Sequence, residues 1–263
     1  MDISFLIDLI KPWTVVLVLS IGRPFGMMIT FVAFSWAQVQ SGPLLMAFAV
    51  SIALPVFSLS SPELPDLIAQ ASTPVALLLV KEILIGALIG WLVSLPLSTA
   101  SAAGDIIDTY WGNSNGGSDP TGGQITVTAN LFMITSLGLF ASIGGFWILT
   151  NLLYESYAAW PMTAGIPNIS AGMAPIIGLV STLIKSALVL AAPILIIMFL
   201  SDVLFLVAAK LGKKINITFL TSLTKTLAAI IMLPLFSFVF IQVQKTRFSA
   251  LPDLSHVIRQ FLQ

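Results

Sequence analysis

Six charged residues within or at the edges of otherwise apolar stretches are the side chains best suited to chemistry. They are Arg23, Lys81, Glu82, Lys185, Asp202 and Lys225. A charge near the centre of a bilayer costs at least about 2.5 kcal/mol, so such a group usually faces a cavity or a partner. One interpretation is a proton or ion relay; the other is snorkelling at helix ends, or pairing between helices. We favour the structural interpretation, because no two acids lie mid-span as proton relays usually require. We therefore expect Lys185 and Lys225 to pair with carboxylates or backbone carbonyl groups of this chain or a neighbour.

Two carboxylates three residues apart, Asp105 and Asp108, are a second candidate site. They share one face if the preceding helix continues that far. As a cation site they lack further oxygen ligands, whereas as polar residues at a helix end they need none. The absence of cysteine and the single histidine, His256, exclude thiolate chemistry and a histidine metal cluster. No phosphate-binding loop, nucleophile elbow or metalloprotease motif occurs, so we expect neither an enzyme nor a cofactor.

Long uncharged stretches indicate the elements that must position these side chains. Residues 24–62, 83–104 and 120–154 contain no Asp, Glu, Lys or Arg. The composition is 57% hydrophobic and 8% charged, against about 25% charged in soluble domains. A bilayer core of about 30 Å takes about 20 helical residues to cross. The sequence therefore predicts an all-α polytopic membrane protein with about six hydrophobic helices broken by Pro and Gly. They cover roughly residues 13–36, 41–59, 75–99, 126–153, 173–201 and 217–243.

One connection, residues 104–124, differs from the others because it is rich in Gly, Asn and Ser. These residues favour turns, so most of this segment is predicted to be a loop. No connection has room for a soluble domain and no internal repeat is visible. Residues 1–263 are therefore predicted to form a single membrane domain. Zero net charge argues against a nucleic-acid partner.

Several motifs resemble one known family. Gly104-Asp105-Ile106-Ile107-Asp108, followed by Gly112, Asp119-Pro120 and Gly122, resembles a segment of the SctT/FliR/SpaR family. This family is the T-subunit of the bacterial type III secretion export apparatus, with its flagellar counterpart. Further similar stretches are Gly144-Gly145-Phe146, Tyr154-Glu155-Ser156-Tyr157, Trp160-Pro161, Ala192-Pro193, Asp202, Asn216, Phe219 and Lys225. The resemblance covers nearly the whole chain.

The resemblance also has departures. Thr109-Tyr110-Trp111-Gly112 stands where the secretion branch often has Asn-Gln-Arg-Gly. Ala209-Lys210 replaces an expected Asn-Arg pair. Ion pairs made by those arginines in relatives are therefore not carried over to this chain.

The resemblance implies a non-enzymatic export-gate subunit in the bacterial inner membrane. Such proteins join R- and S-type subunits, with a U-type switch subunit as a further partner. Their helices form hairpins in a helical assembly, contact membrane lipids, and close a pore that passes unfolded proteins. Residues 109–124 match a segment expected to plug that pore. The implied gate residues are Ile106, Ile107, Tyr110, Trp111, Gly112, Asn113, Asn115, Gly116 and Gly117. Those that shape or hold the ends of the loop are Gly104, Asp105, Asp108, Asp119 and Pro120.

A small secondary transporter is the alternative function, with Asp105, Asp108 or Lys185 coupling transport to an ion. A native gel discriminates the two, because a transporter runs as a monomer or small oligomer and a gate subunit runs with several different partners. Within the export family, Tyr154, Tyr157 and the Trp160-Pro161 pair favour an injectisome over a flagellar system.

Overall fold

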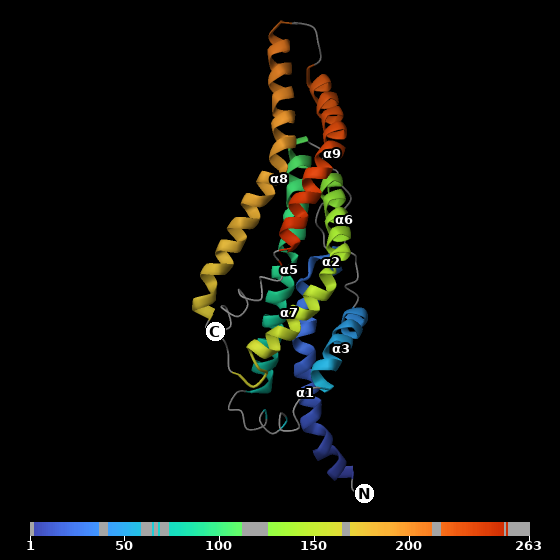
Figure 1. Cartoon of the computed structure of the whole chain (residues 1–263), viewed down its shortest axis with the longest axis vertical. Helices are drawn as coiled ribbons and strands as arrows, with labels where there is room; N and C mark the ends of the chain where they lie inside the picture. The colour runs from blue at the N-terminus through green and yellow to red at the C-terminus, as the bar shows by residue number, and fades with distance from the viewer. Residues whose placement is uncertain are drawn as a thin grey trace. The chain divides into compact units, whose positions relative to one another are not determined.

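Helices are the regular elements of the computed structural model shown in Figure 1. The structure describes residues 3–36, 42–58, 65, 68, 74–111, 126–164, 169–211, 217–249 and 251. In chain order the helices are α1 (Ile3–Thr30), α2 (Val32–Trp36), α3 (Gly42–Ser58), α5 (Val75–Trp111), α6 (Val127–Ser142), α7 (Gly145–Ala159), α8 (Ile169–Leu211) and α9 (Ile217–Ser249). Within those ranges there is no strand, and the predicted all-α fold class is confirmed.

Three helical stretches are long and apolar enough to cross a membrane. They are Trp13–Thr30, Val75–Tyr110 and Ile177–Val207, and the consecutive helices α6 and α7 add a fourth if the pair is one span. The apolar helix α3 has 17 residues, which is short for a crossing. The chain is therefore a multi-pass membrane protein, and among the described residues its six predicted hydrophobic stretches hold three or four helices of spanning length.

Several predicted bounds differ from the observed helices: α1 starts at Ile3 and not near residue 13, and α8 ends at Leu211 and not near residue 201. Two further differences bear on the candidate sites. The helix expected to end near residue 99 continues as α5 to Trp111, because residues 100–111 hold no proline and only one glycine. The single helix expected over residues 126–153 is instead the pair α6 and α7. The break falls at Gly144, whose φ of 75° lies in the left-handed region that glycine adopts without strain.

The chain divides into two compact units. The first comprises Met1–Leu95, Gly144–Ile177 and Ala250–Gln263, and the second comprises Pro96–Ile143 and Gly178–Ser249. Helices α5 and α8 contribute to both units, and three of the boundaries fall at Pro96, Gly144 and Gly178. That the whole chain acts as one membrane domain stays a prediction.

In the first unit, α1 and α5 pack with their backbones in close approach. A Cβ atom added to Gly26 would lie against the backbone carbonyl of Ile83, and one added to Gly86 against that of Arg23. Small residues on both helices permit this approach, as in many membrane helix pairs. The Thr30 hydroxyl adds a hydrogen bond of 2.7 Å to the Ala87 carbonyl oxygen. Helix α3 lies beside α1 (Figure 1).

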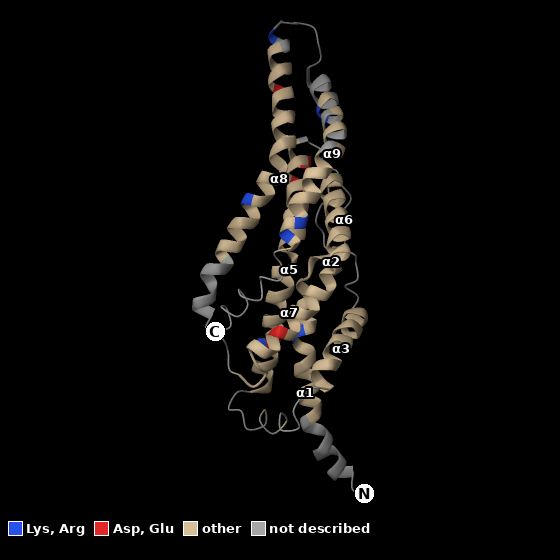
Figure 2. Cartoon of the chain, in the orientation of Figure 1, with Lys and Arg blue, Asp and Glu red and all other residues tan. Residues whose placement is uncertain are grey.

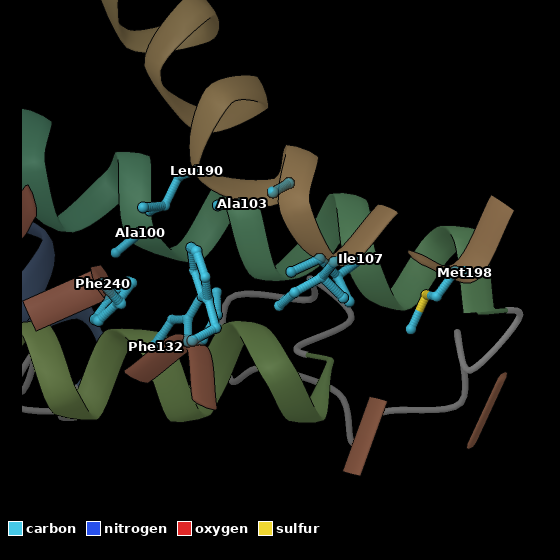
Figure 3. Packing of buried hydrophobic residues seen from close by; sticks show 10 residues of the cluster. Ala100, Ala103, Ile107, Phe132, Leu190, Met198 and Phe240 are labelled. Carbon is cyan, nitrogen blue, oxygen red and sulfur yellow. The ribbon is translucent and has the colours of Figure 1, made fainter. Parts of the chain in front are cut away.

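In the second unit, four helices enclose one hydrophobic cluster (Figure 3). The buried members are Ala100, Ala103, Ile107, Phe132, Leu190, Ala191, Ile194, Met198, Phe236 and Phe240. The rings of Phe132 in α6 and Phe240 in α9 stack with their centroids 4.5 Å apart. Buried Gln244 of α9 donates hydrogen bonds to the Pro96 carbonyl oxygen at 3.1 Å and to Ser136 Oγ at 2.8 Å. This polar contact joins α5, α6 and α9 beside the cluster.

Candidate functional site

The first candidate site is a buried ion cluster in the first unit. Arg23 of α1 and Glu82 of α5 have fully buried side chains. Arg23 Nε donates a hydrogen bond to Glu82 Oε2, and Nη2 donates to Oε1 at 3.3 Å, so the pair is bidentate. Arg23 also reaches α7, because its Nη1 donates to Ser156 Oγ at 3.1 Å and its guanidinium lies 4.2 Å from the ring centroid of Tyr157. One side chain thereby ties together three helices.

Lys81, adjacent to Glu82, completes the cluster. Its Nζ lies 3.0 Å from Glu82 Oε1. It also donates hydrogen bonds to the carbonyl oxygens of Met162 at 2.9 Å and Ala164 at 2.8 Å. Arg23 Nη2 donates to a further carbonyl oxygen in this segment, that of Trp160.

The cluster holds two cations and one anion, and backbone carbonyl groups compensate for the excess positive charge. Carbonyl oxygens of residues 160–164 point at both cations, so the buried positive charge is surrounded by acceptors. Burying a charge without such partners is very costly. The arrangement suits a structural lock that fixes α1, α5, α7 and the turn after α7. The sequence named the three charged residues, but not Ser156 as their partner or these carbonyl groups.

The second candidate site lies where α5 faces the start of α6 in the second unit. Asp108 is buried and accepts hydrogen bonds from the Thr128 backbone N–H at 2.7 Å and the Thr128 hydroxyl at 2.6 Å. Asp105 accepts a hydrogen bond of 3.0 Å from the Thr126 hydroxyl. Thr126 is the N-cap residue of α6 and Thr128 lies in its first turn, where free N–H groups favour a carboxylate. The two acids therefore hold the start of α6 against α5.

Gly104 makes this contact possible. A Cβ atom at Gly104 would overlap the backbone of Ala129 in α6. The sequence singled out Gly104, Asp105 and Asp108 but not the two threonines, which follow the glycine-rich segment.

A third polar group joins the end of α5 to α8 and α9. The Tyr110 hydroxyl donates a hydrogen bond of 2.9 Å to Asp202 Oδ2. Lys225 Nζ lies 2.9 Å from the same oxygen and 4.8 Å from the centroid of the Tyr110 ring. Lys225 thus pairs with a carboxylate, as the sequence analysis expected.

The remaining predicted gate residues divide into helical positions and positions outside the described residues. Ile107 is fully buried in the hydrophobic cluster (Figure 3). Ile106 is partly buried and packs against the cluster. Both lie in α5, as does Trp111, the last residue of that helix. Gly112, Asn113, Asn115, Gly116, Gly117, Asp119 and Pro120 lie outside the described residues. The predicted loop therefore starts later than residue 104.

Lys185 stands apart from the other charged residues. It lies on α8, which carries few charged residues (Figure 2). Lys185 is exposed and has no carboxylate or carbonyl partner in the part of the chain that the structure describes. Its predicted pairing within this chain is not observed among those residues.

The three groups hold helices together through pairs of charges and hydrogen bonds. Among the described residues, no three His, Cys, Asp or Glu side chains are grouped as metal ligands. Asp105 and Asp108 are engaged by threonines, so the described part of this site offers packing and helix capping.

Comparison with known proteins identifies the family. Residues 14–251 match the family described as bacterial export proteins, family 1. The chain belongs to this family. The matched range contains all three polar groups.

Three individual relatives are 29%, 31% and 32% identical to this chain over the regions that align. Yop proteins translocation protein T of Yersinia pestis is 31% identical over 166 residues, covering 61% of this chain and 62% of that protein. The matched region is thus less than two thirds of the length of the Yersinia relative. Surface presentation of antigens protein SpaR of Salmonella typhimurium is 29% identical over 212 residues, covering 79% of this chain and 78% of that protein. SpaR of Shigella flexneri is 32% identical over 159 residues, covering 59% of this chain and 60% of that protein.

Proposed function

We propose that this chain is the T-type subunit of the export gate of a type III protein secretion system. In this role it joins R- and S-type subunits, with a U-type switch subunit as a neighbour, in the bacterial inner membrane. Together they form the closed pore through which unfolded proteins pass. The observation that carries the proposal is the family match over residues 14–251. The names of relatives, which refer to translocation of Yop proteins and surface presentation of antigens, favour an injectisome.

The described surface supports an assembled state. Large apolar side chains are exposed on several helices, for example Phe48 of α3 at 46%, Trp147 of α7 at 74% and Phe238 of α9 at 69%. Lipid or neighbouring subunits must cover such side chains. The buried charges serve packing, and a non-enzymatic role in the export apparatus follows from this proposal.

Residues 109–124 are the proposed gate segment. Tyr110, near the start of this segment and still in α5, is fixed to Asp202, and Thr128, which follows the segment, is fixed to Asp108. A segment anchored on both sides can change shape without loss of the surrounding fold. This geometry supports a gate role for the residues between the anchors.

A small secondary transporter is less well supported. Its coupling acids would have to be free to bind an ion or a proton. Asp108 instead accepts two hydrogen bonds from Thr128 and Asp105 accepts one from Thr126.

Isolating the tagged chain from the membranes of its own bacterium tests the proposal. We expect R- and S-type subunits to co-purify, and we expect loss of the gene to abolish protein secretion. Recovery of the wild-type chain as a homogeneous monomer, with secretion intact in the deletion strain, would contradict it.

A further inference from the structure

Gln244 of α9 has a buried amide group of which one half is unpaired. The side chain is fully buried, and its Nε2 donates hydrogen bonds to the Pro96 carbonyl oxygen at 3.1 Å and to Ser136 Oγ at 2.8 Å. Its Oε1 atom is buried too and has no hydrogen-bond partner in the described part of the chain. A reversed amide would place Oε1 against the Pro96 carbonyl oxygen, and two acceptors cannot share a hydrogen bond. Gln244 therefore presents a buried acceptor that needs a donor.

Ser136 of α6 has the complementary need. Its side chain is fully buried, and its Oγ atom accepts the hydrogen bond from Gln244. A hydroxyl group also carries one hydrogen to donate, and the contacts among the described residues provide no acceptor for it. The unused donor of Ser136 and the unused acceptor of Gln244 are neighbours that do not bond to each other directly. A small group that both donates and accepts can join them.

The same turn of α5 is short of hydrogen-bond donors. Pro96 lies inside the apolar stretch Val75–Tyr110, and it has no N–H to donate to the Leu92 carbonyl oxygen one turn earlier. Within a membrane-spanning helix, neighbouring helices, hydroxyl side chains or ordered waters satisfy the backbone groups that a proline frees. Gln244 already donates to the Pro96 carbonyl oxygen from α9. The unpaired polar atoms therefore gather at the proline break.

A water molecule meets these needs better than a metal cation. A water that accepts from the Ser136 hydroxyl and donates to Gln244 Oε1 closes a ring with the hydrogen bond from Gln244 Nε2 to Ser136. Buried waters make about three hydrogen bonds each, and the second hydrogen can serve a carbonyl group that Pro96 frees. A metal cation would need about six oxygen ligands, and the N–H groups of Gln244 would repel it.

We propose that Gln244 Oε1 and the Ser136 hydroxyl bind a structural water molecule at the proline break of α5. This water site joins α5, α6 and α9 within the second unit. It uses no residue of the proposed gate segment, so it stands whether or not the chain is an export-gate subunit.

A cryo-EM map of the purified chain with its co-purifying subunits, at a resolution that shows ordered waters, tests the site directly. We expect an isolated peak about 2.5–3.0 Å from both Gln244 Oε1 and Ser136 Oγ. A map without this peak, or with a protein donor in its place, would overturn the proposal. The wild-type map gives this answer even if a variant fails to fold.

Gln244→Met should abolish the peak, because methionine has a similar length and lacks the amide oxygen that holds the water. Gln242→Met is the matched control, since Gln242 lies on the same helix and is exposed. The control variant should keep the peak at the height seen in the wild type. A full peak in Gln244→Met would remove Gln244 as a ligand and contradict the proposal.

Radiolytic labelling gives a second measurement in membranes. Short X-ray pulses turn bound waters into hydroxyl radicals, which modify the side chains beside them. Phe240 and Phe248 are buried and lie one turn on either side of Gln244. Their labelling should be about threefold or more lower in Gln244→Met than in the wild type and in Gln242→Met. Equal labelling in all three proteins would contradict a water at this site.

Discussion

Arg23, Lys81 and Glu82 illustrate how fully buried charges act as a unit. Each Arg23 and Lys81 nitrogen group depends on Glu82, on Ser156 or on carbonyl oxygens of residues 160–164. In a site without water, a charge that loses its partner keeps its desolvation penalty. The stability of the cluster therefore depends on every member being present. Its single acid is the most sensitive point, because it neutralises two cations.

Glu82→Gln should destabilise the protein by about 3–5 kcal/mol, because Arg23 and Lys81 would be left without their shared anion. Unfolding by SDS in mixed micelles, measured on the purified chain or its complex, gives this difference. Glu155→Gln is the matched control. Glu155 lies on α7 and makes one exposed hydrogen bond, with Asn151. Glu155→Gln should change the free energy of unfolding by less than about 0.5 kcal/mol. Equal losses of stability for the two substitutions would contradict the role of Glu82 as the shared anion of Arg23 and Lys81.

Lys225→Ala should reduce assembly before it alters conduction. It removes the cation beside Asp202 Oδ2, whose other partner is the Tyr110 hydroxyl. Hydrogen bonds to charged groups contribute about 1.5–3 kcal/mol, so the assembled fraction should fall by about tenfold or more. Lys225→Arg should keep most of the assembled fraction, because the positive charge is retained. The assembled amount and the export rate are measured in the same strain. Normal assembly with abolished export would instead favour the relay interpretation.

Among the elements, α5 organises the described structure. It packs against α1 through glycines, caps α6 through Asp105 and Asp108, and contacts α8 and α9 in the hydrophobic cluster. The sequence predicted this helix but ended it near residue 99, because Gly104 and the Asn-Gly-rich segment suggested an early loop. The three alanines and one serine of residues 100–103 do not disfavour a helix, and tertiary contacts decide whether it continues.

The contacts between elements were harder to predict than the elements. Runs of hydrophobic residues predict the helices, because each run must be buried in protein or in lipid. The sequence also identified the charges that pair. It did not identify their partners, since Asp202 lies 92 residues from Tyr110 and no local pattern encodes that separation. Backbone carbonyl groups, such as those of residues 160–164, carry no sequence signal, because every residue has one.

Gly86→Ala tests the close packing of α1 and α5. The added Cβ would meet the Arg23 carbonyl, which is backbone and cannot rotate away. Overpacking of this kind costs about 1–3 kcal/mol, and the neighbouring Arg23 side chain would be displaced with it. Gly138→Ala in α6 is the control, because no described atom beyond its own stretch of helix lies within 4 Å of an added Cβ. It should be neutral or stabilising by up to about 1 kcal/mol. Thermal unfolding of the two purified variants gives the comparison, and a stable Gly86→Ala protein would contradict close backbone packing.

At the scale of the whole molecule, the chain combines anchored helices with uncovered apolar surface. The ion cluster of the first unit and the hydrophobic cluster of the second each fix several helices. Helix α8, in contrast, leaves Val189, Ile196 and Leu204 more than half exposed. The described helices are held together where they pack on one another, and apolar side chains stay exposed where lipid or other subunits must cover them. The proposed gate segment, residues 109–124, begins in α5, where Tyr110 is held by Asp202, and ends before Thr128, which is held by Asp108.

Deleting residues 113–118 should make the closed gate leak ions and small solutes. An apolar constriction excludes ions by dewetting, so a plug that is too short to fill the pore loses this barrier. Tyr110 and Thr128, which lie outside the deletion, keep their contacts with Asp202 and Asp108. The fold is therefore expected to survive, and assembly with partners is checked in the same preparation. Four of these six residues are already Gly or Ser, so replacing Asn113 by Gly and Asn115 by Ser keeps the length, and this variant should leak less than the deletion. Permeability is measured in membranes that contain the full gate. Unchanged permeability in the deletion variant, with normal secretion, would reduce this segment to a plain connection between α5 and α6.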